Sequence, residues 1–330
     1  MKDYILVTGG SGFIASHLID NLIELNYYVV NLDKLDYCSN YDYTYDIDNK
    51  YKFIHGNITN LELLRHLFNN YNFKYVFHLA AQTHVDNSFY NSLQFTYDNV
   101  IGTHTLLEVC REYNKLEKFI HMSTDEVYGE VLKNEDIKNE SSLLLPTNPY
   151  AATKAGAEML VQAYYKSFKL PIIIIRCNNI YGPRQYPEKV IPSFINNLLN
   201  NKPCYIHGDG NSERHFLYIS DAIDALILIL NKGEINNIYN ISSKDTSIKI
   251  IKLAKLLIRK INQNENKNQN GNENKNQNEN ENNYIEFIED RKFNDYRYLI
   301  SSEKLNNLGW IPKIKFSEGL NNTINFFKEK

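Results

Sequence analysis

Cysteine is scarce in this sequence, and its copies lie far apart. Cys38, Cys110, Cys177 and Cys204 form no Cys-x-x-Cys pair. Zinc sites and disulfide frameworks need cysteines at short or repeated spacings, so this pattern argues against both. We therefore predict no metal site and a reduced, cytoplasmic setting.

The chain also lacks an excess of positive charge and any long apolar run. Its formal net charge is -3, so no basic surface favours a nucleic-acid partner. The apolar run over 225–230 is far shorter than the ~20 residues that span a bilayer. The apolar run over 5–7 is too short for a signal peptide. Nucleic acid and membranes are therefore disfavoured as partners.

The chain is long enough for two domains. It has 330 residues, which can form two ordinary domains with proper cores. Short apolar runs alternate with segments of helical spacing, which predicts an α/β fold with a Rossmann-type doubly wound parallel sheet and a smaller α/β C-terminal domain. The expected strands cover 4–8, 28–32, 52–55, 75–79, 119–122 and 170–175, and the expected helices cover 16–25, 61–69, 92–113 and 149–168.

A glycine-rich turn follows the first expected strand. Gly9 lets the backbone turn sharply, Gly12 allows a close approach to a pyrophosphate, and Ala15 permits close packing of the next helix. The second strand leads to Asp33, about 20 residues further on, where a carboxylate can accept the ribose hydroxyls of adenosine. An acid there repels a 2'-phosphate, so the pattern predicts NAD rather than NADP.

Small and polar residues follow the third and fourth expected strands. Asn57 can contact an adenine edge, and Ala80 and Ala81 leave room for a cofactor. His84 follows at the same rim. Ligands of open parallel sheets bind at the carboxyl ends of the strands, so we expect these residues to border the cofactor.

Two adjacent acids, Asp125 and Glu126, follow the strand over 119–122. Such a pair at a strand end is costly unless it is solvated, paired or used in chemistry. Further on, Tyr150 and Lys154 are one helical turn apart, which places the phenol and the ammonium on one face of a helix. We expect the cation to lower the pKa of the phenol, so that the tyrosine can act as a general base.

The alternation of strands and helices weakens after residue 176. We predict an NAD-binding Rossmann domain over 1–176, to which the chain returns near 215–241, and a mainly substrate-binding domain over 177–330. Residues 262–283 are almost only Asn, Glu, Gln and Lys. Such a segment buries too little apolar surface to offset its ordering entropy, which predicts a disordered insertion.

The sequence resembles the extended short-chain dehydrogenase/reductases, and among them the nucleoside-diphosphate-glucose 4,6-dehydratases. The resemblance covers almost the whole chain except the Asn-rich insertion. Its discriminating part is Thr-Asp-Glu over 124–126, because related sugar epimerases have a sequence similar to Ser-Ser-Ala there. The strongest matches lie over 9–14, 80–88, 123–129, 186–189 and 290–298.

This resemblance implies a mechanism with NAD as the cofactor. Tyr150, helped by Lys154, would take the proton of the carbon-4 hydroxyl while hydride leaves for NAD. Glu126 would then remove the carbon-5 proton, and Asp125 would protonate the departing carbon-6 hydroxyl. Hydride return to carbon 6 would give a 4-keto-6-deoxy sugar. Thr124 would hydrogen-bond the carbon-4 oxygen.

The resemblance also implies two sets of binding residues. Asn57 and Ala15 depart from the family's common Asp and Gly, and both remain compatible with NAD. The NAD set is Gly9, Gly12, Phe13, Ile14, Asp33, Lys34, Asn57, Ile58, Ala80, Ala81, Thr83, Asn99, Ser123, Tyr150, Lys154 and Asn178. The nucleotide-sugar set is His84, Thr124, Asn179, Lys189, Arg214, Asn240, Arg291 and Asp295, with Arg214 and Arg291 at the diphosphate.

Three alternatives to the dehydratase stay open: a nucleotide-sugar epimerase, a decarboxylase, and a non-catalytic dinucleotide sensor. The acid pair speaks against the first two, and the retained tyrosine and lysine speak against the third. The stretches over 82–88 and 294–298 look like plant rhamnose-synthase and animal dehydratases, which favours UDP-glucose over dTDP-glucose. The resemblance further implies a homodimer formed through the helices around Leu106 and Leu160, and a role in rhamnose-type deoxysugar biosynthesis.

Overall fold

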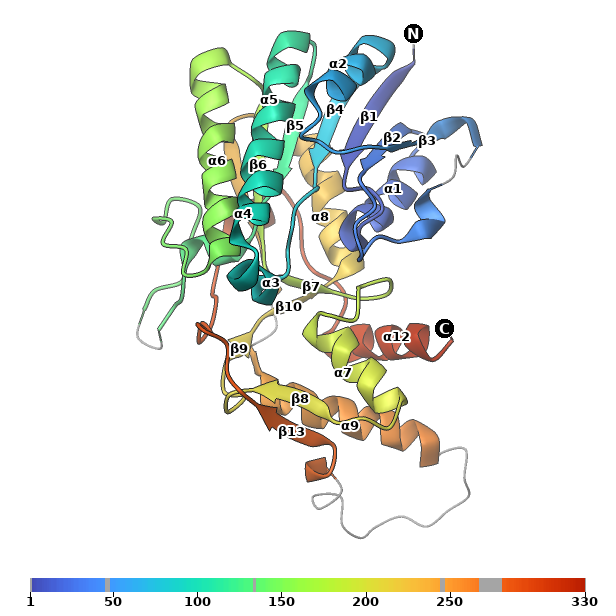
Figure 1. The fold of residues 1–330 in the computed structure, drawn as a ribbon, viewed down its shortest axis with the longest axis vertical. Coiled ribbons are helices and arrows are strands. Elements are labelled where there is room, and N and C mark those ends of the chain that lie inside the picture. Colours follow the sequence, from blue (N-terminus) through green and yellow to red (C-terminus); the bar gives the residue numbers. More distant parts are fainter. Residues whose placement is uncertain (1, 45–47, 133–134, 244–246, 267–280, 330) are drawn as a thin grey trace.

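The computed structural model describes residues 2–44, 48–132, 135–243, 247–266 and 281–329. Figure 1 shows an upper part built around a central sheet and a smaller lower part of short strands and helices. The N-terminus lies in the upper part, and the last helix lies in the lower part. Within the described residues, no helix is both long and apolar enough to cross a membrane.

The central sheet has seven parallel strands in the order β11-β6-β5-β4-β1-β2-β3. The order reverses between β1 and β4, where a doubly wound sheet opens a crevice at the carboxyl ends of its strands. The predicted Rossmann-type fold class is therefore confirmed. The strands are β1 (Asp3–Thr8), β2 (Tyr28–Asp33), β3 (Tyr51–His55), β4 (Asn72–His78), β5 (Lys118–Met122), β6 (Ile172–Cys177) and β11 (Asn237–Ile241).

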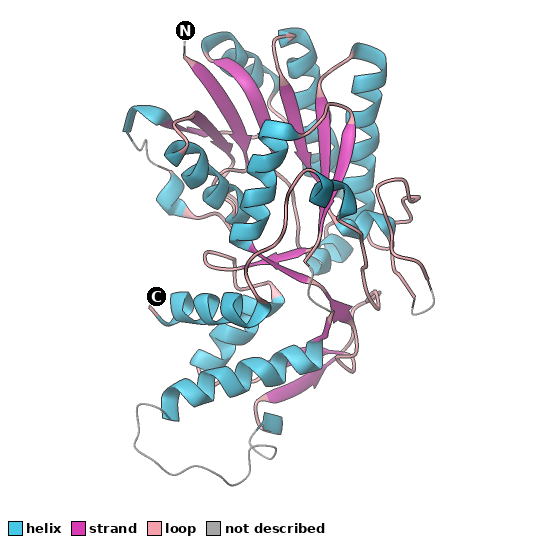
Figure 2. Ribbon diagram, turned by 180° about the vertical axis from the view of Figure 1, so that it is seen from behind, coloured by secondary structure: helices cyan, strands magenta, loops and turns pink. Residues whose placement is uncertain are grey.

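Helices cover both faces of this sheet, which Figure 2 shows from behind. Helices α2, α5 and α6 pack side by side on one face, and α1 and α8 contact each other on the other. Ile5 and Val7 of β1 join the core beneath α1, whereas Leu6 joins the core beneath α2 and α5. Because both faces are buried, inner strands such as β6 contain continuous apolar runs. The helices are α1 (Phe13–Glu24), α2 (Leu61–Asn70), α5 (Gly102–Tyr113), α6 (Pro149–Phe168) and α8 (Ile219–Lys232).

The helix expected over 92–113 is continuous in the structure but changes type in its middle. It begins as α4 (Ser92–Phe95), widens into the π-turn η3 (Thr96–Ile101) and continues as α5. A π-turn closes its hydrogen bonds over one more residue than an α-helix, and such turns often occur at functional sites. Here it buries Asp98 and Asn99.

The lower part consists of two-stranded pairs and helices. β8 pairs with β13, β9 with β12, and β7 with β10, which leads directly into α8 and so back to the central sheet. These elements are β7 (Asn179–Tyr181), α7 (Val190–Leu199), β8 (Cys204–His207), β9 (Glu213–Arg214), β10 (Phe216–Tyr218), β12 (Ile248–Lys249), α9 (Ile250–Asn266), β13 (Ile285–Ile288) and α12 (Phe316–Lys328). The remaining short elements are η1 (Tyr41–Tyr43), η2 (Asp48–Lys50), α3 (Val85–Tyr90), η4 (Asp125–Tyr128) and α11 (Glu303–Asn307), which packs against β11.

The disordered insertion was predicted over 262–283, but both ends of this range belong to described parts of the fold. Helix α9 continues to Asn266, because its apolar face is anchored in the core of the lower part. At the other end, Glu281 is buried and pairs with Arg259 of α9 at 2.5 Å. The prediction was therefore wrong at both ends of this segment, and residues 267–280 lie outside the described residues.

Candidate active site

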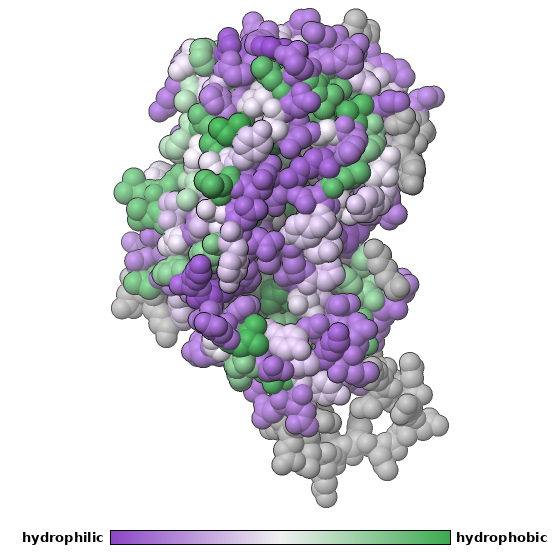
Figure 3. All heavy atoms as spheres, viewed as in Figure 1, coloured by the Kyte–Doolittle hydropathy of each residue, from purple (hydrophilic) through white to green (hydrophobic). Residues whose placement is uncertain are grey.

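A cavity of about 490 Å³ lies where the two parts of the molecule meet. The space-filling view in Figure 3 shows the surface hollowed between them, with mainly hydrophilic residues around the hollow. The upper wall comes from the glycine turn after β1, from the ends of β2, β4 and β5, and from the start of α6. The lower wall comes from the segments before α7, around β9 and over 291–298. The cavity thus occupies the edge of the sheet where the sequence predicts ligand binding.

The turn after β1 presents the N-terminus of α1 to this cavity. Gly9 has a φ of +69°, and a Cβ there would lie 2.7 Å from the backbone of Ala80, so only glycine fits. Gly12 is the N-cap of α1 and offers no side chain to the first backbone N–H groups, and the first turn holds no acidic residue. These N–H groups and the helix dipole form an anion site. The turn therefore suits a pyrophosphate.

Asp33 ends β2 and borders the cavity. Its carboxylate accepts the N–H groups of Ser11 at 3.0 Å and Leu35 at 2.7 Å. Burial raises the pKa of Asp33, and these two bonds oppose the shift. The neighbouring Lys34 pairs with Asp98 at 2.9 Å, so its charge is already matched within the protein. This acidic corner disfavours an additional phosphate on the adenosine ribose.

The loop after β4 is held in place by the π-turn. The side chain of Asn99 accepts the N–H of Gln82 at 2.7 Å and donates to its carbonyl at 3.0 Å. It also donates to the hydroxyl of Thr153 in α6 at 2.9 Å. Its neighbour Asp98 accepts the side-chain amide of Gln82 at 3.0 Å. The wider turn lets two consecutive residues reach the same loop, which fixes one wall of the cavity.

The two neighbouring acids after β5 point in different directions. Glu126 lines the cavity, and its Oε2 accepts the Nδ2 of Asn148 at 3.1 Å. Asp125 is only 2% exposed and turns into the wall, where it accepts the Nδ2 of Asn178 at 2.6 Å. Thr124 also lines the cavity, and its hydroxyl donates to Asp125 at 3.3 Å. One short 3-10 turn, η4, thus carries both an acid in the wall and an acid in the cavity.

The surroundings of these acids shift their protonation. Burial raises the pKa of Asp125 to about 7, and the negative charge of Glu126 adds to this shift. Burial also raises the pKa of Glu126, and the hydrogen bond from Asn148 opposes that shift. Near neutral pH, Asp125 therefore holds a proton for part of the time. Two carboxyl groups in distinct environments form a suitable acid and base pair.

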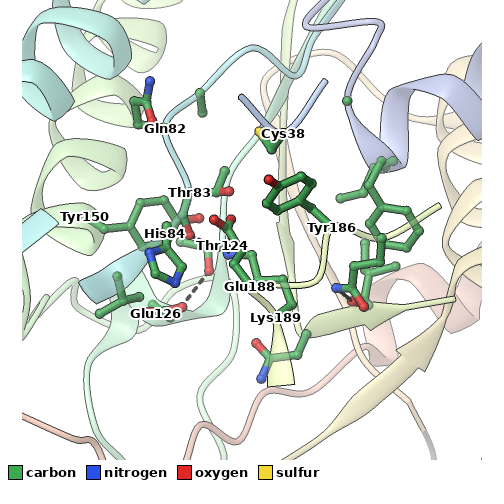
Figure 4. A pocket seen from close by; sticks show the side chains of 18 of the residues that line it. Cys38, Gln82, Thr83, His84, Thr124, Glu126, Tyr150, Tyr186, Glu188 and Lys189 are labelled. Carbon is green, nitrogen blue, oxygen red and sulfur yellow. Dashed lines mark hydrogen bonds and ion pairs between the residues drawn. The ribbon is translucent and has the colours of Figure 1, made fainter. Parts of the chain in front are cut away.

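Tyr150 and Lys154 lie on the face of α6 that borders the cavity. Figure 4 shows Tyr150 beside Thr124 and Glu126, and the Lys154 ammonium donates to the Met122 carbonyl at 2.6 Å. Burial lowers the pKa of Lys154 to about 8. Burial, and next the charge of Glu126, raise the pKa of Tyr150. The expected lowering of the phenol pKa is therefore wrong, because burial and the nearby carboxylate outweigh the cation.

Three cations from the lower part face the cavity from the other side. Arg291 pairs with Asp86 of α3 at 2.7 Å. Lys189 donates to a backbone carbonyl of the loop after β4 at 2.7 Å. Arg214 donates to the carbonyl of Asp295 at 2.9 Å. Arginine guanidinium groups in this arrangement suit phosphate groups, which they can bind through two hydrogen bonds at once.

Comparison with known proteins assigns the chain to a family. The family model for GDP-mannose 4,6 dehydratase matches residues 6–323. The chain belongs to the nucleotide-sugar 4,6-dehydratases. A dTDP-D-glucose 4,6-dehydratase of Dictyostelium discoideum is 51% identical over 98% of this chain and 81% of its own length.

Two further comparisons place the chain among the nucleotide-sugar 4,6-dehydratases. A trifunctional UDP-glucose 4,6-dehydratase, 3,5-epimerase and reductase of Arabidopsis thaliana is 44% identical over 98% of this chain and 47% of its own length. The crystal structure of the dTDP-glucose 4,6-dehydratase of Streptomyces venezuelae, with NAD and TYD bound, superimposes with a TM-score of 0.89. It is 33% identical, and the match covers 99% of this chain and 97% of the other.

Most of the residues predicted for a nucleotide-sugar 4,6-dehydratase site surround the cavity. Asp125, Asn99 and Asn240 do not line it, and Asn240 is fully buried with its carbonyl oxygen bonded to the Tyr128 hydroxyl at 2.9 Å. The predicted residues that line the cavity are Gly9, Gly12, Phe13, Ile14, Asp33, Lys34, Asn57, Ile58, Ala80, Ala81, Thr83, His84, Ser123, Thr124, Glu126, Tyr150, Lys154, Asn178, Asn179, Lys189, Arg214, Arg291 and Asp295.

Sequence reasoning missed two residues at this dehydratase site. Asn148 caps α6 by accepting the N–H of Ala151 at 2.9 Å, and its other amide atom holds Glu126. An Asn before Pro signals a helix start, but not this second contact. Tyr298 is 5% exposed and lies 3.5 Å from Glu126, with its hydroxyl bonded to Asp295. No local pattern reveals its contact with Glu126, because that residue is distant in the sequence.

The described residues contain no group of three or more His, Cys, Asp or Glu side chains placed to hold a metal ion. The buried His78 lies in β4 and contacts the hydroxyls of Thr8 and Thr103 at 2.8 Å each.

Proposed function

We propose that this protein is an NAD-dependent 4,6-dehydratase that converts a nucleoside-diphosphate-glucose to the 4-keto-6-deoxy sugar, with UDP-glucose or dTDP-glucose as the substrate. One observation carries the proposal: Glu126, Tyr150 and Lys154 line one cavity, and Asp125 lies in its wall directly beside Glu126. An epimerase or a decarboxylase has no elimination step that needs the acid pair. A non-catalytic sensor needs neither pair.

The upper wall fits NAD, which when bound supplies the hydride acceptor for sugar carbon 4 and returns the hydride to carbon 6. The start of α1 would hold the pyrophosphate, Asp33 the ribose, and Asn57 and Ile58 the adenine. The hydroxyl of Ser123 and the carbonyl oxygen of Asn178 are buried beside the cavity and lack a hydrogen-bond partner within the described part of the chain. A bound ligand can satisfy both atoms.

In the first step, Tyr150 would take the proton of the carbon-4 hydroxyl. The phenol borders the cavity and contacts the Thr124 hydroxyl, which lowers its pKa against the effect of burial. Lys154 would stabilise the phenolate that must form, because its ammonium lies on the same helix face. The product of this step is a ketone, which makes the neighbouring carbon-5 hydrogen acidic.

In the second step, Glu126 would remove the carbon-5 proton and Asp125 would protonate the departing carbon-6 hydroxyl, so that water leaves. Glu126 is suited to the base role, because its carboxylate faces the cavity and is oriented by Asn148. Asp125 is suited to the acid role, because its pKa of about 7 keeps a proton available. To deliver that proton, the side chain of Asp125 must rotate away from Asn178 and toward the cavity. Glu126 would finally return its proton to carbon 5.

The lower wall would hold the nucleotide diphosphate of the substrate. Arg214 and Arg291 would face the phosphates and Lys189 would add a third positive charge, and all three line the cavity. Binding would replace the ion pair between Arg291 and Asp86, two residues that both line the cavity. His84, Asn179 and Asp295 would contact the sugar and the nucleoside from the same walls.

The test is mass spectrometry of the purified protein after incubation with UDP-glucose or dTDP-glucose and without added NAD. The expected result is loss of one water from at least one substrate, because the cycle is redox-neutral and the cofactor stays bound. The faster substrate identifies the preferred base. Absence of water loss from both substrates, with NAD present in the protein, would contradict the proposal.

The activity should depend on pH through the acid pair. Water elimination, measured as kcat/KM, is expected to fall as the pH rises through about 7, because Asp125 then loses the proton that it must donate. It should also fall at low pH, where Glu126 becomes protonated. The measurement is a pH profile of kcat/KM in the wild type and in Asp125→Asn. If kcat/KM of the variant still fell in the same way as the pH rises, a group other than Asp125 would be responsible for that fall.

The protein is also proposed to form a homodimer through the helices α4 to α6. Leu106 is fully buried within the subunit, so the contact surface must come from exposed side chains of this region. Leu93 is 82% exposed, and Ile101 and Met159 are 43% and 49% exposed. A second copy would cover these apolar groups.

Light scattering tests this dimer. Leu93→Glu combined with Ile101→Glu is expected to give a monomer where the wild type is a dimer, because burying two carboxylates at the interface is unfavourable. Ile311→Glu is the matched control, since Ile311 is 54% exposed on the segment between α11 and α12. A wild type that is monomeric at micromolar concentration would refute the dimer.

A cytoplasmic location is proposed from the thiols. All four cysteines are free, and Cys110, Cys177 and Cys204 are buried. Free thiols without disulfides are typical of a reducing compartment. Cell fractionation would test this location.

A further inference from the structure

A buried ion pair joins helix α6 to the end of strand β6. Arg176 is 2% exposed, and its Nη2 donates to Glu158 at 2.6 Å while its Nε lies 3.1 Å from both carboxylate oxygens. Glu158 is 0% exposed and follows Lys154 by one turn of α6. Burying two charges costs desolvation free energy, and apolar residues of equal volume often give equal stability. A gain in stability therefore does not explain why this ion pair is buried here.

The same guanidinium reaches the turn that carries the two acids. Its Nη1 donates to the hydroxyl of Tyr128 at 2.7 Å, and its centre lies 4.7 Å from the centre of that ring. Tyr128 is the last residue of η4, which begins at Asp125, and it is 1% exposed. Its hydroxyl donates onward to Asn240 of β11 at 2.9 Å. One side chain, Arg176, thus connects the helix of the phenol to the turn of the acids.

We propose that Arg176 and Tyr128 are positioning residues, which hold the turn of Asp125 and Glu126 at the distance from α6 that the elimination step needs. The proposal rests on the proposed dehydration. Neither residue lines the cavity, so each acts through others. The phenol that serves the oxidation step lies on α6 itself, whereas the acids lie on η4, which this connection joins to α6. Loss of the connection should therefore slow elimination more than oxidation.

The experiment uses the full chain with its retained cofactor and the variant Tyr128→Phe. Removing the hydroxyl keeps the ring in the core but breaks the bonds to Arg176 and Asn240. Water loss, and exchange of the carbon-5 hydrogen with deuterated water, are expected to slow by about tenfold or more, since a displacement of about 1 Å can cost roughly 10²-fold. The oxidation of carbon 4, followed by nicotinamide absorbance in a single turnover, should change little. The reduced cofactor should therefore persist longer in each turnover.

Tyr164→Phe is the matched control. It removes another buried tyrosine hydroxyl from α6, where the partner is Glu108 at the outer side of the helix. The control should leave both steps unchanged. Bound NAD and the unfolding midpoint are measured for each variant, so that a loss of folding is separated from a loss of positioning.

The outcomes separate this proposal from the proposed function. A wild type that loses no water refutes the function itself. A wild type that loses water, with Tyr128→Phe slowed equally in both steps or in neither, refutes the positioning role. If Tyr128→Phe does not fold, Arg176→Lys serves instead, because lysine keeps the charge against Glu158 but cannot also bridge to Tyr128. The same bias toward slow elimination is expected, and its absence overturns the proposal.

Discussion

Replacing Glu126 by glutamine is expected to slow water loss by roughly 10²- to 10⁴-fold, the usual contribution of a general base. Glutamine has nearly the same shape and can still contact Asn148, but its neutral amide cannot take the carbon-5 proton. Oxidation at carbon 4 does not use this carboxylate, so it should continue and leave the cofactor reduced. Mass spectrometry of the product and nicotinamide absorbance follow the two steps separately.

Glu117→Gln provides the comparison for this variant. The side chain of Glu117 is 53% exposed and its partner is Lys74, far from the cavity wall. This substitution should leave both steps at the wild-type rate. If Glu126→Gln eliminated water at the wild-type rate, the base would have to be another group of the cavity, and the proposed roles of the acid pair would need to be exchanged or abandoned.

Replacing Tyr150 by phenylalanine is expected to stop the reaction earlier, with every step slowed by roughly 10²- to 10⁴-fold. Without the phenol, no group takes the carbon-4 hydroxyl proton, and the ketone does not form. The carbon-5 hydrogen then stays non-acidic, even though Glu126 is intact. The variant should show neither reduced cofactor nor exchange of the carbon-5 hydrogen. Glu126→Gln, in contrast, should lose only the exchange.

Stopped-flow absorbance and deuterium uptake from solvent distinguish these two variants. Tyr164→Phe on the same helix is again the control, because its hydroxyl bonds to Glu108 away from the cavity. Bound NAD should be equal in all samples. Exchange at carbon 5 in Tyr150→Phe at the wild-type rate would show that oxidation proceeds without the phenol, and the proposed order of steps would then be incorrect.

The sheet and the glycine turn could be predicted from the sequence because their causes are local or periodic. Strands buried on both faces must be apolar at every position, as residues 172–175 of β6 are. The conformation of Gly9 and the close approach of Ala80 require a glycine at this position, and that glycine can be recognised in the sequence. Asp33 follows at a spacing that one strand and one helix dictate.

The orientation of the acid pair could not be predicted in the same way. Asp125 turns into the wall because Asn178, from the end of β6, bonds to it there. Glu126 is held in the cavity by Asn148, from the start of α6. Both partners are distant in the sequence, so no spacing reveals them. The raised pKa of Tyr150 escaped prediction for a related reason: burial depends on the complete fold.

The π-turn η3 fixes the number of residues in the helix that runs from Ser92 to Tyr113. One residue fewer would restore a regular α-helix, but it would rotate the following segment by about 100° about the helix axis. Leu106 and Leu107, which are fully buried, would then leave the core, or Asn99 would lose the loop that it holds. Single-residue deletions along this helix should therefore be selected against more strongly than conservative exchanges, and homologous chains should keep its length constant.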